Sequence, residues 1–218
     1  FQRMLENRSI IASRLASENP NYTGAYDSTG FPQGYGATQS EVLLHSFLST
    51  YTGRDPNTAK LRTFPTIPLP NWRLTYNLHS GIKALREHFQ SFNITHAYRS
   101  AYNIGGFTSN VKYHGSENFP GFASALDDLG NYIPHKYMDV VTLTEQFGPF
   151  LGLEVTMKNS LMTRIEYKKT RNLSLSFVNN QLTEVRSNEF VTGVGYRFKN
   201  IKFNVRSMNG GPKKLLKS

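Results

Sequence analysis

The sequence predicts an all-β protein with antiparallel strands, preceded by a small helical and loop segment. Three observations carry this prediction. The last third of the 218 residues alternates apolar and polar side chains, which is the period-two pattern of strands. Helical spacing of apolar residues occurs mainly in the first part of the chain. Stretches rich in Gly, Asn and Pro separate the periodic runs, as turns and loops do.

The N-terminal helices are predicted from periodicity and from their end signals. Apolar side chains recur at helical spacing through residues 1–19, and Pro20 ends this pattern. Residues 20–39 are rich in Gly, Tyr, Asn and Ser, which indicates a long loop. Ser40 can cap a second helix, and Gly53 can close it.

The middle of the chain changes from an extended segment to a strand. Three prolines within residues 65–70 force an extended backbone, because each fixes φ and restrains the residue before it. Residues 81–89 are expected to form a short helix. Residues 92–104 have a period of two and are expected to form a strand. Residues 105–137 are expected to be mostly loop, with one weak strand near Val111.

Five strands with strict alternation are predicted in the last third of the chain. They comprise residues 151–157, 161–168, 172–177, 190–198 and 201–206. Antiparallel neighbours must place their apolar residues on one face, which constrains the length of each connection. This condition predicts a three-residue turn at 158–160, an odd-length loop centred on Thr170 and a two-residue turn at 199–200. A longer loop is expected at residues 179–189.

The charge distribution separates the two faces of this predicted sheet. Residues 1–157 hold 12 basic and 12 acidic side chains, whereas residues 158–218 hold 13 basic and 3 acidic ones, so the net charge of +10 lies after residue 157. The apolar faces of the five strands contain no charged residue, and the strand cations lie on the opposite faces. A basic block of this kind indicates either an anionic partner or a solvated basic face.

Two architectures fit this pattern. In a soluble sheet the apolar face packs on a core, and in an outer-membrane barrel it meets lipid while the polar face lines the lumen. Few helical segments are available to cover the apolar face, and aromatic residues gather near strand ends, as in interfacial girdles. Gly193 and Gly195 on the polar face suit a curved wall. These features favour the barrel. A soluble basic β-sheet protein that binds nucleic acid or another polyanion is the alternative, and a small complete barrel is a third possibility.

The sequence contains no motif for catalysis or metal binding. G-x-S-x-G, H-E-x-x-H and the phosphate-binding glycine motifs do not occur, there is no Cys, and the six His residues lack ligand spacing. We therefore expect no enzymatic activity, no cofactor and no metal site. Nucleic-acid binding would require aromatic and cationic side chains on one face, whereas here they alternate onto opposite faces.

Several long stretches resemble the SprA/Sov family of Bacteroidetes. The resemblance is carried by FPTIPLPNWRLTYN at 64–77, THAYRSAY at 95–102, and TEQFGPFLGLEVTMKNSL, EYKKTRNLSLSF, NNQLTEVRSNE and GVGYRF within 143–198. ENR at 6–8 and GYGATQSEVLLHSFLSTYTGRDPNT at 34–58 are similar as well. Together these stretches cover most of the chain.

Members of this family are very large outer-membrane barrels that form the translocon of type IX secretion and, in some bacteria, support gliding motility. The resemblance implies that this chain is a C-terminal-region fragment of such a transmembrane antiparallel β-barrel, in the cell outer membrane. Residues 1–65 would be a helical and loop segment inside or capping the lumen, and residues 66–218 would be wall strands and loops. The implied partners are the remainder of the same barrel polypeptide, a PorV-type lateral barrel, a periplasmic plug protein, secreted cargo proteins and outer-membrane lipid, with no nucleic acid.

In a barrel wall the two faces of the strands have different surroundings. The charged residues expected to face the lumen are Glu154, Arg164, Glu166, Lys168, Arg197, Lys202 and Arg206. The apolar residues expected to face lipid are Leu153, Val155, Ile165, Leu175, Val194 and Phe203.

Overall fold

The structure, a computed structural model, describes residues 2–64, 70–119, 121–198, 202–205 and 214–217, and for the last two ranges it describes the backbone alone. The protein is mostly β-sheet, with two helices at its N-terminal end, as the sequence predicts. The main sheet is open, and β1 and β7 form its edges. None of the described helices is long and apolar enough to span a membrane.

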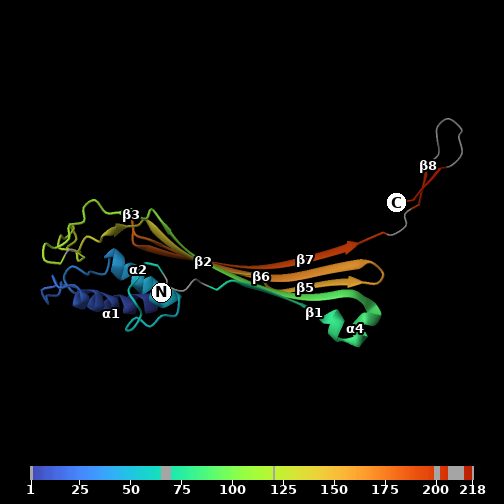
Figure 1. The fold of residues 1–218 in the computed structure, drawn as a ribbon, viewed down its shortest axis with the longest axis horizontal. Coiled ribbons are helices and arrows are strands. Elements are labelled where there is room, and N and C mark those ends of the chain that lie inside the picture. Colours follow the sequence, from blue (N-terminus) through green and yellow to red (C-terminus); the bar gives the residue numbers. More distant parts are fainter. Residues whose placement is uncertain (1, 65–69, 120, 199–201, 206–213, 218) are drawn as a thin grey trace. The chain divides into compact units, whose positions relative to one another are not determined.

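Four long strands and one short strand make the main sheet. In spatial order they are β1 (Trp72–Asn77), β2 (Phe89–Gly105), β5 (Val140–Met157), β6 (Leu161–Ser176) and β7 (Gln181–Tyr196). Figure 1 shows the long strands running side by side. β1 pairs antiparallel with β2, with Trp72 opposite Tyr98. Neighbours in the sheet are also neighbours in sequence, except that residues 106–139 form a long insertion between β2 and β5.

Tight turns connect β5 to β6 and β6 to β7, as an antiparallel order requires. The predicted three-residue turn at 158–160 is confirmed: the N–H of Ser160 donates to the carbonyl of Met157 at 3.0 Å, and Ser160 has a φ of 69°. A left-handed residue at this position is typical of a three-residue hairpin. Residues 177–180 connect β6 to β7, and Asn180 closes this turn with a φ of 55°, which Asn tolerates better than most residues.

Two predicted interruptions of the strands are wrong. The loop expected around Thr170 does not exist, because β6 runs unbroken through it. The loop expected at residues 179–189 ends after two residues, because β7 begins at Gln181. Both stretches consist mainly of polar residues, and side chains of β6 and β7 pair with each other there. One example is the ion pair in which Nζ of Lys168 lies 3.6 Å from Oε1 of Glu189.

The two N-terminal helices form where the sequence places them. They are α1 (Gln2–Glu18) and α2 (Ser40–Tyr51). The cap of α2 differs from the prediction, because Gln39 rather than Ser40 provides it. The Oε1 atom of Gln39 accepts hydrogen bonds from two backbone N–H groups of the first turn, at 2.7 and 2.9 Å. Gly53 follows the helix with a φ of 71°, the left-handed conformation that commonly ends helices.

The remaining elements are short. They are α3 (Leu78–Gly81), α4 (Lys83–His88), β3 (Thr108–Ser109), β4 (Lys136–Tyr137), β8 (Lys202–Val205) and β9 (Lys214–Lys217). α4 stands where a short helix is predicted at 81–89, α3 ends where this range begins, and β3 stands close to the weak strand expected near Val111. β3 pairs with β4, and β8 pairs with β9. The predicted turn at 199–200 lies outside the described residues.

Two loops of the same construction order the irregular regions that follow α1 and β2. In the first, the Oδ1 of Asp27 accepts hydrogen bonds from the backbone N–H groups two and four residues later. Asp127 makes the same two bonds in the second loop. The loops are joined, because the N–H of Gly36 donates to Oδ1 of Asn131 at 2.9 Å and the N–H of Tyr132 donates to the carbonyl oxygen of residue 34 at 2.7 Å. Side-chain bonding of this kind replaces regular secondary structure in loops.

The chain divides into two compact units. Unit 1 comprises Phe1–Leu69, Ser100–Thr144 and Asn172–Val185. Unit 2 comprises Pro70–Arg99, Glu145–Arg171 and Arg186–Ser218. The N-terminal helices therefore share unit 1 with parts of the sheet.

The core of unit 1 joins the second helix to the sheet. Phe47 and Leu44 of α2 pack in one cluster with Leu143 of β5 and with Leu173 and Leu175 of β6. All five side chains are at most 1% exposed. Because helix side chains cover it, the expectation that Leu175 faces lipid is wrong.

Two basic side chains are held inside unit 1. Arg14 of α1 donates to the carbonyl oxygens of Pro56 at 2.6 Å and of Ala59 at 2.9 Å, which fixes the segment after α2. His45 of α2 is buried. Burial, together with the positive charges of Arg14 and Arg54, lowers the pKa of His45 to about 4.

Candidate functional site

An aromatic band crosses four strands of unit 2. We define it as Trp72, His96, Tyr98, Phe147, Phe150 and Tyr167, from β1, β2, β5 and β6. The ring centroids of Trp72 and Tyr98 lie 4.6 Å apart, and those of Tyr98 and Phe147 lie 4.8 Å apart. Phe150 continues the series at 5.3 Å from Phe147 and 6.2 Å from Tyr167. These separations are typical of rings in contact, so the aromatic band is continuous.

Charged side chains contact the aromatic band along one of its borders. The Nζ of Lys169 lies 4.8 Å from the centre of the Phe150 ring, which is within cation–π distance. The hydroxyl of Tyr98 donates to Oε1 of Glu145 at 3.1 Å. The Oε2 atom of Glu145 accepts from Nη1 of Arg171 at 3.3 Å.

Large apolar side chains of unit 2 are exposed. Leu74 and Tyr76 are each 62% exposed, Leu151 is 55%, Phe190 is 67% and Val194 is 74% exposed. They come from β1, β5 and β7 of a single sheet. Large apolar side chains exposed together on one sheet are typical of surfaces that contact another protein or a membrane.

Three neighbouring strands repeat one order of side chains along their length. Each strand carries a charged residue, then an aromatic one, then an aliphatic one. In β5 these are Glu145, Phe147 and Leu153, and in β7 they are Arg186, Phe190 and Val194. In β6, which runs in the opposite direction, they are Arg171, Tyr167 and Ile165 in order of decreasing residue number. Because neighbouring strands are antiparallel, the sequence from charged to aromatic to aliphatic runs in the same spatial direction in all three. The aromatic band therefore separates a charged region from an apolar one.

A second group of aromatic residues lies at the other end of the apolar region. Phe89 and Phe92 contact each other at the start of β2, with ring centroids 5.6 Å apart. Tyr196 and Phe198 do so at the end of β7, at 4.9 Å. Tyr98 and Phe92, which alternate onto the same face of β2, are six positions apart, which is about 20 Å of strand.

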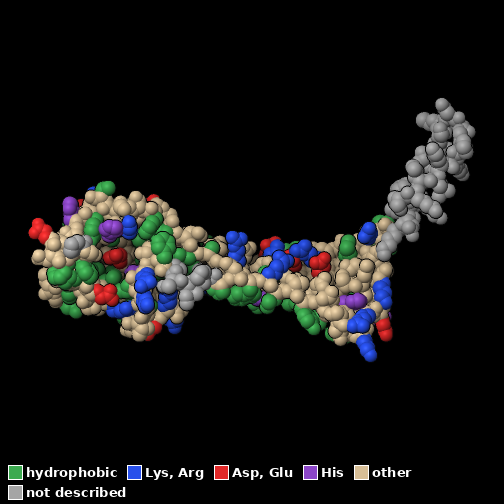
Figure 2. Space-filling model, viewed as in Figure 1, with side chains coloured by type: hydrophobic (Ala, Val, Ile, Leu, Met, Phe, Trp, Pro, Cys, Tyr) green, Lys and Arg blue, Asp and Glu red, His purple; other side chains and the backbone are tan. Residues whose placement is uncertain are grey.

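The opposite face of unit 2 carries an ion-paired cluster. The Nη2 of Arg164 lies 2.6 Å from Oε1 of Glu166, and Nζ of Lys168 lies 3.8 Å from Oε2 of the same carboxylate. Lys168 also pairs with Glu189 of β7. In Figure 2, blue and red side chains gather along one margin of the long strands and green side chains along the other.

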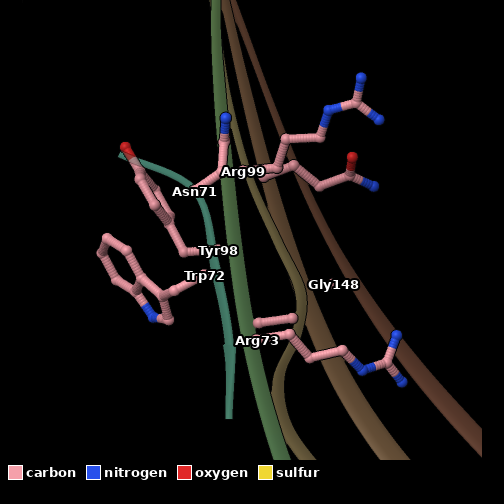
Figure 3. Close-up of a pocket in the computed structure, with 8 residues that line it drawn as sticks. Asn71, Trp72, Arg73, Tyr98, Arg99 and Gly148 are labelled. Atoms are coloured by element: carbon pink, nitrogen blue, oxygen red, sulfur yellow. The ribbon is translucent and has the colours of Figure 1, made fainter. Parts of the chain in front are cut away.

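A hollow at the start of β1 shows the separation of the two faces at close range. It has a volume of about 570 Å³ and is lined by Asn71, Trp72, Arg73, Ala97, Tyr98, Arg99, Gln146 and Gly148. Figure 3 shows the rings of Trp72 and Tyr98 on one side of the strands and the side chains of Arg73 and Arg99 on the other. Alternation along β1 and β2 therefore sorts aromatic from cationic residues within a few ångströms.

The structure brings together three of the residues expected to face a lumen. Arg164, Glu166 and Lys168 belong to the ion-paired cluster. Glu154 and Arg197 have exposed side chains. For Lys202 only the backbone is described, and Arg206 lies outside the described residues.

The residues expected to face lipid have different surroundings. Val194 is 74% exposed, Leu153 and Ile165 are half-buried, and Val155 is only 7% exposed. For Phe203 only the backbone is described. Leu175, the last residue of this group, is buried in the core of unit 1.

Sequence reasoning missed several residues of these two surfaces. Glu189 falls within the loop expected at residues 179–189, although it completes the ion-paired cluster. Trp72 begins the aromatic band, and Arg73 and Arg99 extend the charged face. The run WRLTYN at 72–77 alternates aromatic or apolar with polar residues, and this signal could have identified β1 and its two faces.

The described residues contain no candidate metal site, and comparison with known proteins gives no match. Among the described residues, no three His, Asp or Glu side chains gather as a metal site would require. No protein-family model matches the sequence, and no curated protein matches it.

Proposed function

We propose that this chain is a segment of the wall of an outer-membrane protein-conducting pore, with the apolar side of unit 2 toward lipid and its charged side toward the lumen. The observation that carries the proposal is the exposed apolar surface of unit 2, bordered by the aromatic band and the second aromatic group. In line with the sequence resemblance, the pore would export folded cargo proteins by type IX secretion and would support gliding motility in some bacteria.

The lengths of the strands support a wall that crosses a membrane. Outer-membrane barrels have an apolar band of about 25 Å between two aromatic girdles. The strands β2, β5, β6 and β7 contain 16 to 18 residues, more than the roughly 10 needed to cross, so each can extend beyond the bilayer.

The charged face supports a passive role in transport. Its cations and carboxylates neutralise each other in part and remain hydrated, as the 60% exposure of the Arg164 side chain indicates. A hydrated surface without large apolar patches offers a folded cargo little to adhere to. The proposed transport requires no catalytic group in this segment.

The open edges of the sheet support further strands on both sides. Backbone N–H and C=O groups at a sheet edge cost several kcal/mol each when they meet hydrocarbon without a partner, which is why membrane-spanning sheets close into barrels. In the proposed pore, other strands of the same polypeptide pair with β1 and β7. A PorV-type lateral barrel and a periplasmic plug protein are the further partners that the resemblance implies.

The alternative of a soluble protein that binds nucleic acid has less support. At Trp72 and Tyr98 the neighbouring cations Arg73 and Arg99 lie on the other side of the strands, which disfavours stacking of bases there. Lys169 does lie against Phe150 and Tyr167 of the same band, so the main observation against this alternative is the exposed apolar surface. A soluble protein would also leave Val194 and Phe190 in water.

Photo-crosslinking from two adjacent residues of β6 tests the conduit role. A benzophenone amino acid replaces either Arg164, on the charged face, or Ile165, on the apolar face, in cells that are exporting protein. We expect crosslinks to exported proteins from position 164 and crosslinks to lipid from position 165. The adjacent position serves as the matched control, because it has the same depth and the same neighbours along the chain.

Two outcomes would contradict the proposal. If neither position crosslinks to an exported protein during active secretion, this wall does not line a conduit. If position 165 crosslinks to exported proteins and position 164 does not, the two faces have been assigned in reverse.

A further inference from the structure

We infer that unit 2 binds the phosphate of an anionic lipid headgroup in a hollow lined by Lys169, Arg171 and Arg186, beside the aromatic band. This inference rests on the proposed function, because it requires the apolar side of unit 2 to face a membrane. It adds a specific ligand to a surface that otherwise makes only general contact with lipid.

The hollow is built from three adjacent strands. It has a volume of about 440 Å³ and is lined by Glu145, Phe147, Lys169, Thr170, Arg171, Arg186 and Asn188. These residues come from β5, β6 and β7, which are neighbours in the sheet. Three cations and one carboxylate therefore surround the space, so its lining is positively charged.

The cations are positioned by different means. Glu145 holds Arg171 at 3.3 Å and is itself held by the hydroxyl of Tyr98 at 3.1 Å. Lys169 has no carboxylate within salt-bridge distance among the described residues, and its Nζ lies 4.8 Å and 5.3 Å from the ring centres of Phe150 and Tyr167. The ammonium group of Lys169 is therefore held against the two rings by cation–π contacts rather than by a carboxylate, and its N–H groups can still donate to an anion.

The location of the hollow selects a lipid headgroup over other anions. It lies at the charged side of the aromatic band, which is the level of the headgroups if the apolar region contacts the acyl chains. Basic pockets at this level bind anionic headgroups, and guanidinium groups match phosphate oxygens with two parallel hydrogen bonds. An acyl chain attached to the same phosphate can lie along the exposed side chains of Leu151 and Phe190. Free phosphate would make the polar contacts without these apolar ones.

Lipid retention by the whole protein tests the inference. The protein is reconstituted in nanodiscs with equal amounts of phosphatidylglycerol and phosphatidylcholine, mildly delipidated, and its retained lipids are counted by native mass spectrometry. We expect preferential retention of phosphatidylglycerol. Each interfacial cation contributes about fivefold to binding of anionic lipid, so the double variant Lys169→Gln and Arg186→Gln should lose about 25-fold of this preference.

Matched variants separate the site from general effects of charge and folding. The double variant Arg164→Gln and Lys168→Gln removes two cations from the opposite face and should retain the preference. Lys169→Arg keeps the charge and should retain it as well. If the double variant at positions 169 and 186 keeps the preference, the inference is overturned.

Two further outcomes are distinguishable. If inorganic phosphate displaces phosphatidylglycerol completely, the hollow binds a free anion, and the lipid assignment is overturned while the proposed pore stands. If the protein does not enter nanodiscs at all, the proposed function fails, and the inference fails with it.

Discussion

Lys168 of β6 and Glu189 of β7 form an ion pair across neighbouring strands, with 3.6 Å between Nζ and Oε1. The same ammonium group lies 3.8 Å from Glu166, which also holds Arg164 at 2.6 Å. The side chain of Glu166 is 11% exposed, whereas those of Arg164 and Glu189 are each 60% exposed. A single buried carboxylate therefore organises two cations, and the outer carboxylate is mainly hydrated.

Removing the inner carboxylate should cost more than removing the outer one. Glu166→Gln leaves two cations without their shared partner and should lower the free energy of unfolding by about 1 to 3 kcal/mol. Glu189→Gln removes a largely exposed contact and should cost less than about 1 kcal/mol. Urea denaturation of the two variants measures the difference, and equal costs would contradict the assigned roles.

The helix-covered core of unit 1 makes a contrasting prediction for two leucines. Leu175→Ala should cost about 3 to 5 kcal/mol, because it opens a cavity beneath α2. Leu151→Ala, at a side chain that is 55% exposed, should cost less than about 1 kcal/mol in detergent. Hydrogen exchange of the α2 amides should accelerate in the first variant alone. Unchanged exchange at α2 would show that Leu175 is not part of this core.

Buried His45 should make unit 1 sensitive to acid. Its pKa is about 4 in the folded protein and 6.5 ordinarily, so between these values the unfolded chain takes up a proton that the folded chain does not. Stability should therefore be full above about pH 6.5, fall as the pH decreases, and reach a loss of about 3 kcal/mol near pH 4.

The control for this prediction is His45→Gln, which removes the titrating group. Hydrogen exchange of α2, corrected for the intrinsic rate at each pH, should show a loss of protection between pH 6.5 and 4 in the wild type and a smaller loss in the variant. Identical pH profiles would mean that another group is responsible.

Local patterns were sufficient to predict the strands whose two faces differ in polarity. Residues 151–157 and 161–168 alternate apolar and polar side chains, and parity placed the turn at 158–160 where the structure has it. The middle of β6 and the start of β7 were missed because Lys169, Thr170 and Arg171 resemble a loop when read alone. Their strand conformation depends on partners on other strands, such as Glu145.

The bonding inside the predicted loops and the cover of the sheet could not be predicted, for a related reason. Asp27 and Asp127 order their loops through bonds to their own backbones, and Asn131 joins the two loops, although 95 residues separate it from Gly36. Leu175 has the same alternation as its neighbours that lack a cover. Only the packing of α2 on this part of β6, a contact between residues distant in sequence, distinguishes it.

Arginine substitutions at two adjacent positions of β7 should have unequal costs in the membrane. Val194→Arg should cost about 2 to 4 kcal/mol, because the side chain would enter hydrocarbon. At Gly193, on the other face, an added Cβ meets nothing within 4 Å, so Gly193→Arg should cost less than about 1 kcal/mol. Unfolding from lipid vesicles measures both. A cost near zero at Val194 would place that side chain in water.

Cysteine accessibility in native outer membranes tests the lipid-facing assignment most directly. The chain contains no Cys, so single cysteines at Gly193 and Val194 can be compared over the unsubstituted background with a membrane-impermeant maleimide. Both positions are exposed in the structure, so the protein itself shields neither. We predict that Gly193→Cys reacts, and that Val194→Cys reacts only after detergent removes the lipid. Equal labelling of both cysteines in the intact membrane would contradict the account.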